Sequence, residues 1–532
     1  MFVDAKQLES NAQIKTDICI VGAGAAGITL ARELSGKSFK VFVLVGGGAD
    51  FDTAAQALYT GQQTGDRYTP IDIGRLRMFG GTTNHWAGNC SRLDPIDFEA
   101  RPWIPHSGWP FGFAELEPFY AGAQRYCQIG DFPWDTPSLA LRTGKSLLPF
   151  DEAKIVTGTA RHSPPTRFGE EYGEELKGSE NVSVCFDGHA LELRAAADGA
   201  RVVEVAAGVL GGGRFSIAPR FVVLAAGGIE NARLLLASRQ QHAAGLGNAY
   251  DLVGRFFMDH PVVEGARIVT TRPFREVYFN GGRIDDVAVA GFAKIAEPTL
   301  RREQLSNVRM PFAASPKRQV LEGLFSFDQL TRSFDRSLWP DNLWYHVGNV
   351  ARDIDIVADK VARKYFTTKL FESLDQFGGY VIDAMTEQTP NPDSRVTLQS
   401  SRDAFGVPLA RLDYRLQRRD RENLARCFRI LAAEIGRTGL GRLSALTEVD
   451  DTGLLYDDML SFGQHHMGTT RAHVSPRQGV VDGDLRIHGV ANAYAAGSSV
   501  FATGGCVPPT LTIVALSIRL SRHLARRMEE RE

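Results

Sequence analysis

Residues 16–36 read TDICIVGAGAAGITLARELSG, and this stretch decides the first part of the fold. A short apolar run at 16–21 leads directly into the glycine turn GAGAAG at 22–27. The ITLARELSG that follows has helical spacing, and a second apolar strand is expected at 39–45. A strand, a GxGxxG turn, a helix and a second strand together form the βαβ unit that binds dinucleotides.

The small residues of the turn have different tasks in such a unit. Gly22 allows the tight turn, Gly24 lets a pyrophosphate approach the backbone, and Gly27 permits close packing of helix against strand. Ala25 and Ala26 lie at the start of the helix, where free N–H groups and a partial positive charge attract phosphate. All five residues are therefore predicted to bind a dinucleotide.

One residue of this fingerprint is missing. An acidic residue is expected about 20 residues after the turn, at the end of the second strand, where it binds the ribose hydroxyls. Val45 occupies this place and cannot accept a hydrogen bond. Loss of a charged acceptor costs about 1.5–3 kcal/mol of binding free energy unless a neighbour such as Asp50 or Asp52 compensates. Either the nucleotide is held in another way, or the site is partly degenerate.

The composition is that of a globular protein with more than one domain. The chain has 532 residues, of which 43% are hydrophobic, so it can build more than one core. The 60 Lys and Arg residues balance the 62 Asp and Glu residues, which gives no electrostatic case for nucleic acid or an anionic membrane as partner.

The sequence contains neither a targeting segment nor a metal-binding pattern. Residues 1–17 contain no apolar run of signal-peptide length, and no stretch of about 18 apolar residues predicts a membrane span. We therefore expect a cytoplasmic protein. The six cysteines are scattered without metal-ligand spacing, which predicts reduced thiols and no metal site.

Further motifs follow in order along the chain. They are GGTTNHW at 80–86, VLAAGGIENAR at 223–233, VGRFFMDHP at 253–261, FGQHHMGTTR at 462–471 and NAYAAGSSVFATGGCVPPTLTIVAL at 492–516. Together with the first turn, they resemble the motifs of the glucose–methanol–choline oxidoreductases from end to end. Residues 82–86 also have some likeness to pyranose oxidases.

The resemblance implies an α/β protein with a Rossmann-type FAD-binding domain and a substrate domain built on an antiparallel sheet flanked by helices. Because the flavin domain of the family is discontinuous, we expect it at 1–95, 176–262 and 448–532, with the substrate domain at 96–175 and 263–447. In the substrate domain, the sequence predicts strands at 391–398 and 409–414 and an amphipathic helix at 418–438. Near the C-terminus, it predicts a strand at 493–496 and a helix opening at 508–510.

The resemblance also implies FAD as the cofactor. Beyond the first turn, the predicted FAD-binding residues are Gly81, Thr82, Asn84, His85, Ala226, Gly227, Asn231, Gly497, Ser498, Pro509 and Thr510. In the pyranose-oxidase branch, the histidine that corresponds to His85 is bonded covalently to the 8α-methyl group of the flavin. In related members it only packs beside the flavin, and both forms stay open for His85.

Oxidation of an alcohol needs a base for the hydroxyl proton, and histidine has a suitable pKa. The family places this base three residues before the glycine of the GTxR segment, which corresponds to His465 here. On an extended backbone the adjacent His466 would point the other way. We therefore predict His465 as the base and His466 as a supporting or core residue, against the alternative that both are structural histidines.

The second catalytic position of the family departs from the pattern. The family places Asn or His directly before Pro-Thr-Leu-Thr, whereas this chain has Pro508, whose ring offers no donor or acceptor. Three interpretations follow. His465 works alone, another residue such as His466 or Gln464 substitutes, or the enzyme no longer oxidises alcohols.

The sequence thus predicts an FAD-dependent oxidoreductase for the hydroxyl of a sugar, a glycoside or another alcohol. Oxygen or a quinone-type compound would accept the electrons. Two other hypotheses stay open because of Val45 and Pro508. One is a flavoprotein of the same fold with non-redox chemistry, such as a lyase or cyclisation step, and the other is a degenerate homologue without catalysis. No motif specifies the substrate, the acceptor or the oligomeric state.

Overall fold

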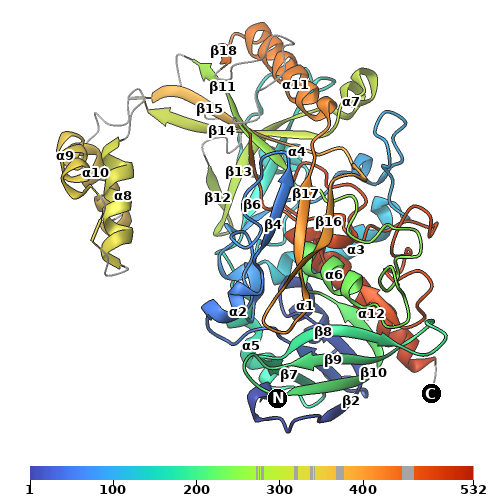
Figure 1. Ribbon diagram of the computed structural model, residues 1–532. Coiled ribbons are helices and arrows are strands. Elements are labelled where there is room, and N and C mark those ends of the chain that lie inside the picture. Colours follow the sequence, from blue (N-terminus) through green and yellow to red (C-terminus); the bar gives the residue numbers. More distant parts are fainter. Residues whose placement is uncertain are drawn as a thin grey trace.

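The computed structural model describes residues 1–270, 273–274, 276, 281–316, 322–335, 339–340, 342–366, 377–445 and 460–530. The strands of this part of the chain form three sheets. In Figure 1 the first sheet lies at the bottom, near both termini, and the second lies at the top.

The first sheet is the parallel sheet that the glycine turn predicts. Its order is β1-β7-β3-β2-β10-β9-β8, with β20 beside β10. The pairs from β1 to β10 and the pair of β10 with β20 are parallel. The pairs of β10 with β9 and of β9 with β8 are antiparallel. The bounds are β1 Phe2–Asp4, β2 Gln13–Val21, β3 Val41–Leu44, β7 Val182–Phe186, β8 His189–Ala195, β9 Val202–Gly208, β10 Arg214–Leu224 and β20 Ala493–Ala495.

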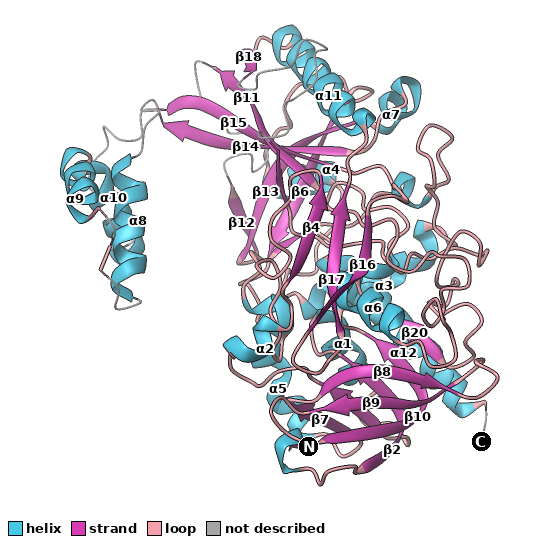
Figure 2. Cartoon of the chain, in the orientation of Figure 1, coloured by secondary structure: helices cyan, strands magenta, loops and turns pink. Residues whose placement is uncertain are grey.

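The second sheet is antiparallel, as expected for a substrate domain of this family (Figure 2). It has nine strands in the order β18-β11-β15-β14-β13-β6-β5, with β12 beside β13 and β19 beside β11. The bounds are β5 Asn89–Cys90, β6 Ile155–His162, β11 Pro261–Val269, β12 Gly282–Ile284, β13 Val287–Ile295, β14 Val308–Pro316, β15 Phe377–Thr386, β18 Arg442–Ala445 and β19 Leu460–Phe462.

The third sheet was not expected from the sequence. It joins β16 (Arg395–Arg402) and β17 (Pro408–Tyr414) to β4 (Gly61–Gly65), which runs parallel to β17. The strands predicted at 391–398 and 409–414 therefore exist, the first of them shifted by four residues, but they do not join the large antiparallel sheet. Their pairing with a segment more than 300 residues away leaves no local signal in the sequence.

The helices fill the space around the sheets. Their bounds are α1 Ala25–Glu33, α2 Thr53–Ala57, α3 Phe113–Tyr126, α4 Thr136–Thr143, α5 Phe168–Gly178, α6 Gly227–Ala237, α7 Glu297–Glu303, α11 Arg418–Arg437 and α12 Thr510–Glu529. Side chains of α1 and α12 share one core with the first sheet. The helix predicted at 418–438 is α11, and its buried Leu424 and Leu431 pack in the core of the second sheet with Val308 and Met310.

Three further helices, which were not predicted from the sequence, form an arm. They are α8 (Glu322–Asp335), α9 (Leu343–Arg352) and α10 (Ile354–Phe366), and they stand apart from the sheets in Figure 1. The arm lies between β14 and β15 in the sequence. Polar residues such as Ser326 and Asn349 are buried in it, whereas Phe325, Trp339 and Trp344 are 60%, 81% and 81% exposed.

Along the chain, segments that contribute strands to the first sheet alternate with segments that contribute strands to the second. Strands of the first sheet come from residues 2–44, 182–224 and 493–495, and strands of the second come from 89–162, 261–316, 377–386 and 442–462. This alternation is compatible with a discontinuous flavin domain, while the domain boundaries themselves stay a prediction.

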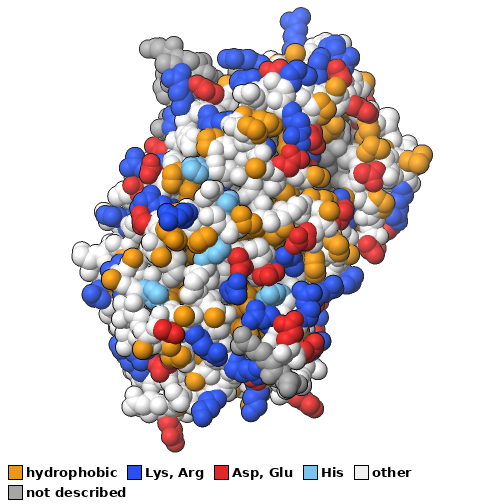
Figure 3. All heavy atoms as spheres, turned by 90° about the vertical axis from the view of Figure 1, so that its right-hand side faces the viewer, with side chains coloured by type: hydrophobic (Ala, Val, Ile, Leu, Met, Phe, Trp, Pro, Cys, Tyr) orange, Lys and Arg blue, Asp and Glu red, His pale blue; other side chains and the backbone are white. Residues whose placement is uncertain are grey.

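The surface charges, the helices and the cysteines can each be compared with what the composition predicts. On the face shown in Figure 3, basic and acidic side chains are interspersed. Within the described residues, none of the helices combines the length and the apolar character that a membrane crossing requires. All six cysteines are unpaired and buried, which agrees with the predicted reduced thiols.

Candidate active site

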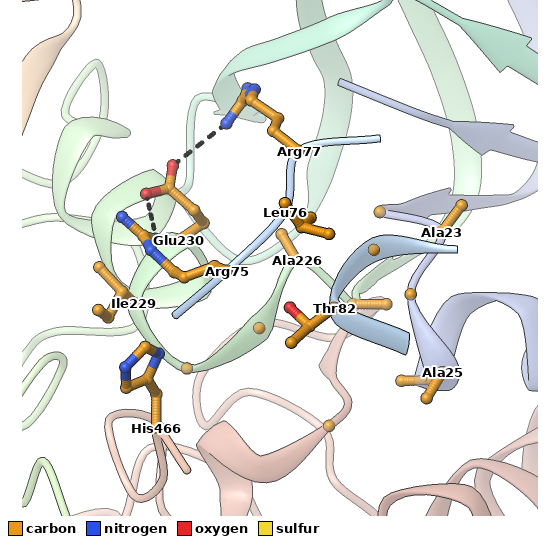
Figure 4. Close-up of a pocket in the computed structure, with 18 of the residues that line it drawn as sticks. Ala23, Ala25, Arg75, Leu76, Arg77, Thr82, Ala226, Ile229, Glu230 and His466 are labelled. Atoms are coloured by element: carbon orange, nitrogen blue, oxygen red, sulfur yellow. Dashed lines mark hydrogen bonds and ion pairs between the residues drawn. The ribbon is translucent and has the colours of Figure 1, made fainter. Parts of the chain in front are cut away.

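A large cavity lies between the first sheet and the loops that lead to the second (Figure 4). Its empty space is about 1410 Å³, including the part open to solvent. The predicted FAD-binding residues that line it are Gly22, Gly24, Ala25, Ala26, Gly81, Thr82, Ala226, Gly227, Gly497, Ser498, Pro509 and Thr510. Motifs that lie up to about 490 residues apart in the sequence thus meet around one cavity.

Four predicted residues lie outside the lining. Gly27 packs instead against the turn, because a Cβ there would lie 1.9 Å from the carbonyl oxygen of Gly22. The Asn231 side chain accepts from the Ala226 N–H at 2.8 Å and donates to Ala496 O, which ties two strand ends together. Asn84 and His85 lie next to the lining residues Thr83 and Trp86 without being part of it.

The glycine turn is shaped to receive a phosphate group. Gly22 has a φ of +104°, and a Cβ there would lie 2.6 Å from the carbonyl oxygen of Ala225, so only glycine fits. A Cβ on Gly24 would meet no protein atom within 4 Å. Helix α1 begins at Ala25 without a side-chain cap, which leaves its first N–H groups free for an anion. This bare backbone fits the pyrophosphate of FAD.

The missing acid at Val45 is not replaced by the neighbours suggested from the sequence. Val45 is buried and lines the cavity, Asp52 caps α2 by accepting the N–H of Ala54, and Asp50 does not line the cavity. A carboxylate reaches the cavity from α6 instead, through Glu230. The cavity lining therefore includes an acidic side chain, on a different element from the one expected.

Glu230 is held by three arginines. Its oxygens lie 2.9 Å from Arg75 Nη1, 3.6 Å from Arg77 Nη1 and 3.2 Å from Arg233 Nη1. The first two contacts are drawn in Figure 4. Burial favours a raised pKa, but the charges of Arg233, Arg75 and Arg77 outweigh it and lower the pKa of Glu230 to about 2. Glu230 is therefore ionised at neutral pH.

The segment that carries two of these arginines was missed from the sequence. Residues 74–78, Tyr59 and Trp86 all line the cavity. The signal was weak, since it consisted of two alternating basic residues, Arg75 and Arg77, shortly before the turn at Gly80 and Gly81. Their role depends on Glu230, about 150 residues further along the chain.

A strained loop carries the predicted base. Gln464 has a φ of +57°, which is left-handed and unfavourable for glutamine. The next residue, His465, donates its backbone N–H to Asp259 Oδ1 at 2.8 Å. Asp259 is fully buried and also accepts the Tyr68 hydroxyl at 2.6 Å and the His260 N–H. Burial raises the pKa of Asp259 to about 6 against the opposing effect of these donors.

The side chain of His465 has a partner that the sequence did not predict. Its Nδ1 lies 2.9 Å from Nδ1 of His260, a fully buried residue. Nε2 of His260 lies 3.2 Å and 3.0 Å from the carbonyl oxygens of Gly504 and Gly505. Gly463 leaves room for this arrangement, because a Cβ there would lie 2.5 Å from His465 Nδ1.

This pairing selects one tautomer of each histidine. Burial lowers the pKa of His260 to about 4, so the ring is neutral at neutral pH. Carbonyl oxygens only accept, so Nε2 of His260 carries the proton and its Nδ1 accepts one from His465. The Nε2 of His465 then has a free lone pair, and within the described residues no side chain or backbone group bonds to it. Burial, His260, Arg309 and His466 together hold the pKa of His465 well below 6.5.

His466 also lines the cavity but has different surroundings. Its ring lies 5.6 Å from Phe257 and 6.3 Å from Tyr68, centroid to centroid, and Figure 4 places it across the cavity from Ala25. Burial lowers the pKa of His466 to about 3, with a contribution from the charge of Arg75. Both histidines therefore line the cavity, whereas His466 was predicted from the sequence to be a supporting or core residue.

Asp259, His260 and His465 also bring three potential metal-ligand atoms within 4.8 Å of one another. Each group already has a hydrogen-bond role, however. The carboxylate accepts the Tyr68 hydroxyl and two backbone N–H groups, the two imidazoles bond to each other, and His260 also bonds to main-chain carbonyls. The grouping is therefore a hydrogen-bond network that orients His465.

Comparison with known proteins identifies the class to which this fold and site belong. A family model described as GMC oxidoreductase matches residues 390–517. The chain is 26% identical to 2-methyl-1,2-propanediol dehydrogenase of Mycolicibacterium austroafricanum, over 97% of this chain and 96% of that protein. It is 24% identical to the fructose dehydrogenase large subunit of Gluconobacter japonicus, over 96% and 98% of the two chains. Its fold is shared with pyridoxine 4-oxidase from Mesorbium loti, with a TM-score of 0.57, 17% identity and coverage of 96% and 99%.

Residues 390–517 thus match the glucose–methanol–choline (GMC) oxidoreductases, and the chain as a whole is similar to dehydrogenases that act on CH–OH groups. The predicted resemblance and fold class are confirmed, and the resemblance implies FAD as the cofactor.

Proposed function

We propose that this enzyme oxidises the hydroxyl of a sugar, a glycoside or another alcohol, with His465 as the base. The observation that carries the proposal is the locked tautomer of His465, whose Nε2 is left free beside the cavity. Residues of the glycine turn and of segment 497–510 would hold FAD, which supplies the hydride acceptor when bound.

The proton pathway follows from the hydrogen bonds of the histidine pair. A substrate hydroxyl that reaches Nε2 of His465 donates its proton there, and the resulting imidazolium is held by His260 through Nδ1. His260 transmits this support to the carbonyl groups of Gly504 and Gly505. The charge on His465 thus forms within an existing network and needs little rearrangement.

Pro508 supports a second candidate function. With no side chain at this position to share the substrate hydroxyl, the family's catalytic pair is incomplete. Gln464 and His466 flank His465 and line the same cavity, so either can supply the second contact. If neither does so, non-redox chemistry on the same fold becomes the better explanation, and flavin reduction separates the two.

The proposed function predicts that an alcohol or sugar bleaches the flavin under anaerobic conditions. We expect His465→Ala to retain FAD but to slow this reduction about 10²–10⁴-fold, which is the usual contribution of a general base. Stopped-flow absorbance with a panel of sugars, glycosides and diols measures the rate.

His242→Ala is a matched control, because that histidine only bonds to a carbonyl of Gly199 outside the cavity. It should reduce at the rate of the unmodified enzyme. Equal rates for His465→Ala and the unmodified enzyme would show that the base is assigned wrongly. A panel without any reductant would favour non-redox chemistry.

The mode of FAD attachment can be tested independently of turnover. Because His85 lies outside the cavity lining, we expect FAD to be held without a covalent bond. Acid precipitation should then release the yellow colour into the supernatant. Colour that stays in the pellet, and is lost from it in His85→Ala, would instead demonstrate a bond through His85.

A further inference from the structure

Arg309 is a buried cation on the second sheet that the proposed function does not use. It lies on β14, opposite Lys294 of β13 and Met385 of β15. Its neighbours Val308 and Met310 belong to the core behind the sheet. Because side chains alternate along a strand, Arg309 points to the opposite face, and it is only 8% exposed.

The fold leaves the charge of Arg309 without a carboxylate. Within the described residues, its hydrogen bonding consists of one contact from Nη1 to Asn89 Oδ1 at 3.2 Å, and no acidic side chain pairs with it. Lys294, directly across the sheet, lies 2.6 Å from Asp94 Oδ1 and is therefore compensated. A buried cation without a counter-ion destabilises a folded protein, and burial accordingly lowers the pKa of Arg309.

Other buried guanidinium groups in the described part of the chain are compensated in one of two ways. Some pair with acids, as Arg101 does with Glu387 at 2.5 Å. Others bond to main-chain carbonyls and lie over an aromatic ring, as Arg161 does at 3.7 Å from the Trp134 ring centroid. Arg309 lies 5.9 Å from the Phe292 ring centroid and bonds to Asn89, but within the described residues it has neither an acid nor a main-chain carbonyl as partner. A group with such an uncompensated charge near a reactive centre is a candidate for ligand binding.

The sheet places Arg309 on the same side as the histidine pair. Met385 is paired with both Arg309 and Val262, so the backbones of these two residues are about 10 Å apart across two strand spacings. Val262 follows His260 by two residues and shares its face of the chain. The charge of Arg309 is also among the causes that lower the pKa of His260 and His465, after burial in both cases.

We propose that Arg309 binds a carboxylate of the substrate, and that the enzyme therefore acts on a hydroxy acid whose hydroxyl is presented to His465. The planar guanidinium has several N–H donors that match the two oxygens of a carboxylate. Because Arg309 and the histidine pair lie on different strands of one face, the acid and the hydroxyl must be separate groups of the substrate, as in a uronic acid or an ω-hydroxy acid. A neutral sugar would leave the buried charge uncompensated.

This inference rests on the proposed alcohol oxidation. In that reaction the hydroxyl proton would pass to His465, the carbon would lose its hydrogen as a hydride, with the C–H electron pair, and become a carbonyl, and bound FAD would supply the acceptor for this hydride. The carboxylate is unchanged and serves for binding alone. Its negative charge would also offset the effect of Arg309 on His465 and make proton uptake easier.

Matched pairs of compounds test the proposal on the FAD-loaded enzyme. One pair is methyl β-D-glucuronide and methyl β-D-glucoside, and the other is 6-hydroxyhexanoate and 1,6-hexanediol. Binding is read from changes in the flavin absorption spectrum and turnover from anaerobic flavin reduction. In at least one pair, we expect the acid to bind about 10-fold or more tightly than its neutral partner. Arg309→Gln should abolish this preference, and Arg309→Lys should retain part of it.

Thermal unfolding controls for damage to the fold. Because Arg309→Gln removes an unpaired charge and breaks no ion pair, its melting temperature should equal or exceed that of the unmodified enzyme. Arg309→Lys keeps the charge and covers the case in which the glutamine variant does not fold.

Several outcomes would overturn the assignment. One is a neutral partner that binds as well as the acid in both pairs, and another is an acid preference that persists in Arg309→Gln. If the neutral compounds also reduce the flavin, the proposed alcohol oxidation survives while the carboxylate site does not. If no compound reduces the flavin, the proposed oxidation fails, and the spectral binding of the acids still decides the role of Arg309.

Discussion

Gly22 and Gly24 lie two residues apart in the same turn, yet the protein would tolerate a side chain at only one of them. Gly22 has a left-handed φ, and a Cβ there would collide with the backbone of Ala225. Gly24 has a φ of −84° and faces open space in the cavity. The first glycine is thus required for folding, and the second is free to serve the ligand.

This difference predicts two distinct phenotypes. Gly22→Ala should lower the free energy of unfolding by about 2 kcal/mol or more, because the Cβ is both strained and overpacked. Gly24→Ala should change it by less than about 0.5 kcal/mol while weakening FAD binding on the order of tenfold, because the methyl group occupies the approach of the pyrophosphate. Urea unfolding of the cofactor-free protein and flavin titration measure the two effects.

Either of two results would contradict this interpretation. If Gly24→Ala binds FAD as tightly as the unmodified protein, the pyrophosphate does not approach this part of the turn. If Gly22→Ala is as stable as the unmodified protein, the turn can rearrange in a way that the close contact with Ala225 does not suggest.

At the scale of elements, the loop at 463–466 shows how the site depends on chain segments from different sheets. Asp259 lies two residues before β11 and accepts the backbone N–H of His465, while His260 orients the His465 ring. The carbonyl groups that orient His260 belong to the loop before α12. The sequence motifs marked all three segments, but they did not indicate that His260 and His465 touch.

The C-terminal helix illustrates the opposite case, in which local chemistry was sufficient. The sequence predicted a helix opening at 508–510, and α12 begins at Thr510 with Pro509 as its N-terminal flanking residue. Proline has no N–H to leave unsatisfied and tolerates this position well. Pro509 and Thr510 both line the cavity, as predicted for FAD-binding residues.

At the scale of the whole molecule, the network around Glu230 fastens distant parts of the chain to one another. Arg75 also donates to the carbonyl oxygens of Ile71 and Tyr59. Arg233 donates to Asp403 and to the carbonyl oxygen of Pro408, near the third sheet. Removal of the Glu230 charge would leave these buried arginines without their common acid.

Glu230→Gln should therefore lower the free energy of unfolding by about 3 kcal/mol at pH 7. The folded pKa of about 2 lies below the ordinary value of 4.5, so the carboxylate stabilises the fold fully above pH 4.5 and loses this effect as the pH falls toward 2. The difference between the variant and the unmodified protein should be constant from pH 7 to 5 and shrink below pH 4.5. Urea unfolding of the cofactor-free protein at several pH values measures it.

Glu422→Gln provides a control for this experiment. Glu422 pairs with Arg418 on α11, and both side chains are exposed, so the loss should be about 0.5 kcal/mol or less. A Glu230→Gln variant that is no less stable than this control would show that the arginines find other partners.

The arm α8–α10 also belongs to this scale. Amphipathic patterns in these segments are compatible with helices, but nothing local indicates that the helices stand apart from the sheets.

The sequence by itself predicted the fold class of this protein and the glycine turn that lines the cavity. Local signals mark a glycine that must have a positive φ, a helix that must begin with free N–H groups and a strand that must be apolar. For that reason the predicted turn, helices and parallel sheet were confirmed. The tertiary structure alone decided the third sheet, the contacts of Glu230 with three arginines, the pairing of His260 with His465 and the absence, within the described residues, of an acid beside Arg309. Each of these depends on side chains or strands that lie far apart along the chain, and such contacts have no periodicity or spacing from which they could be predicted.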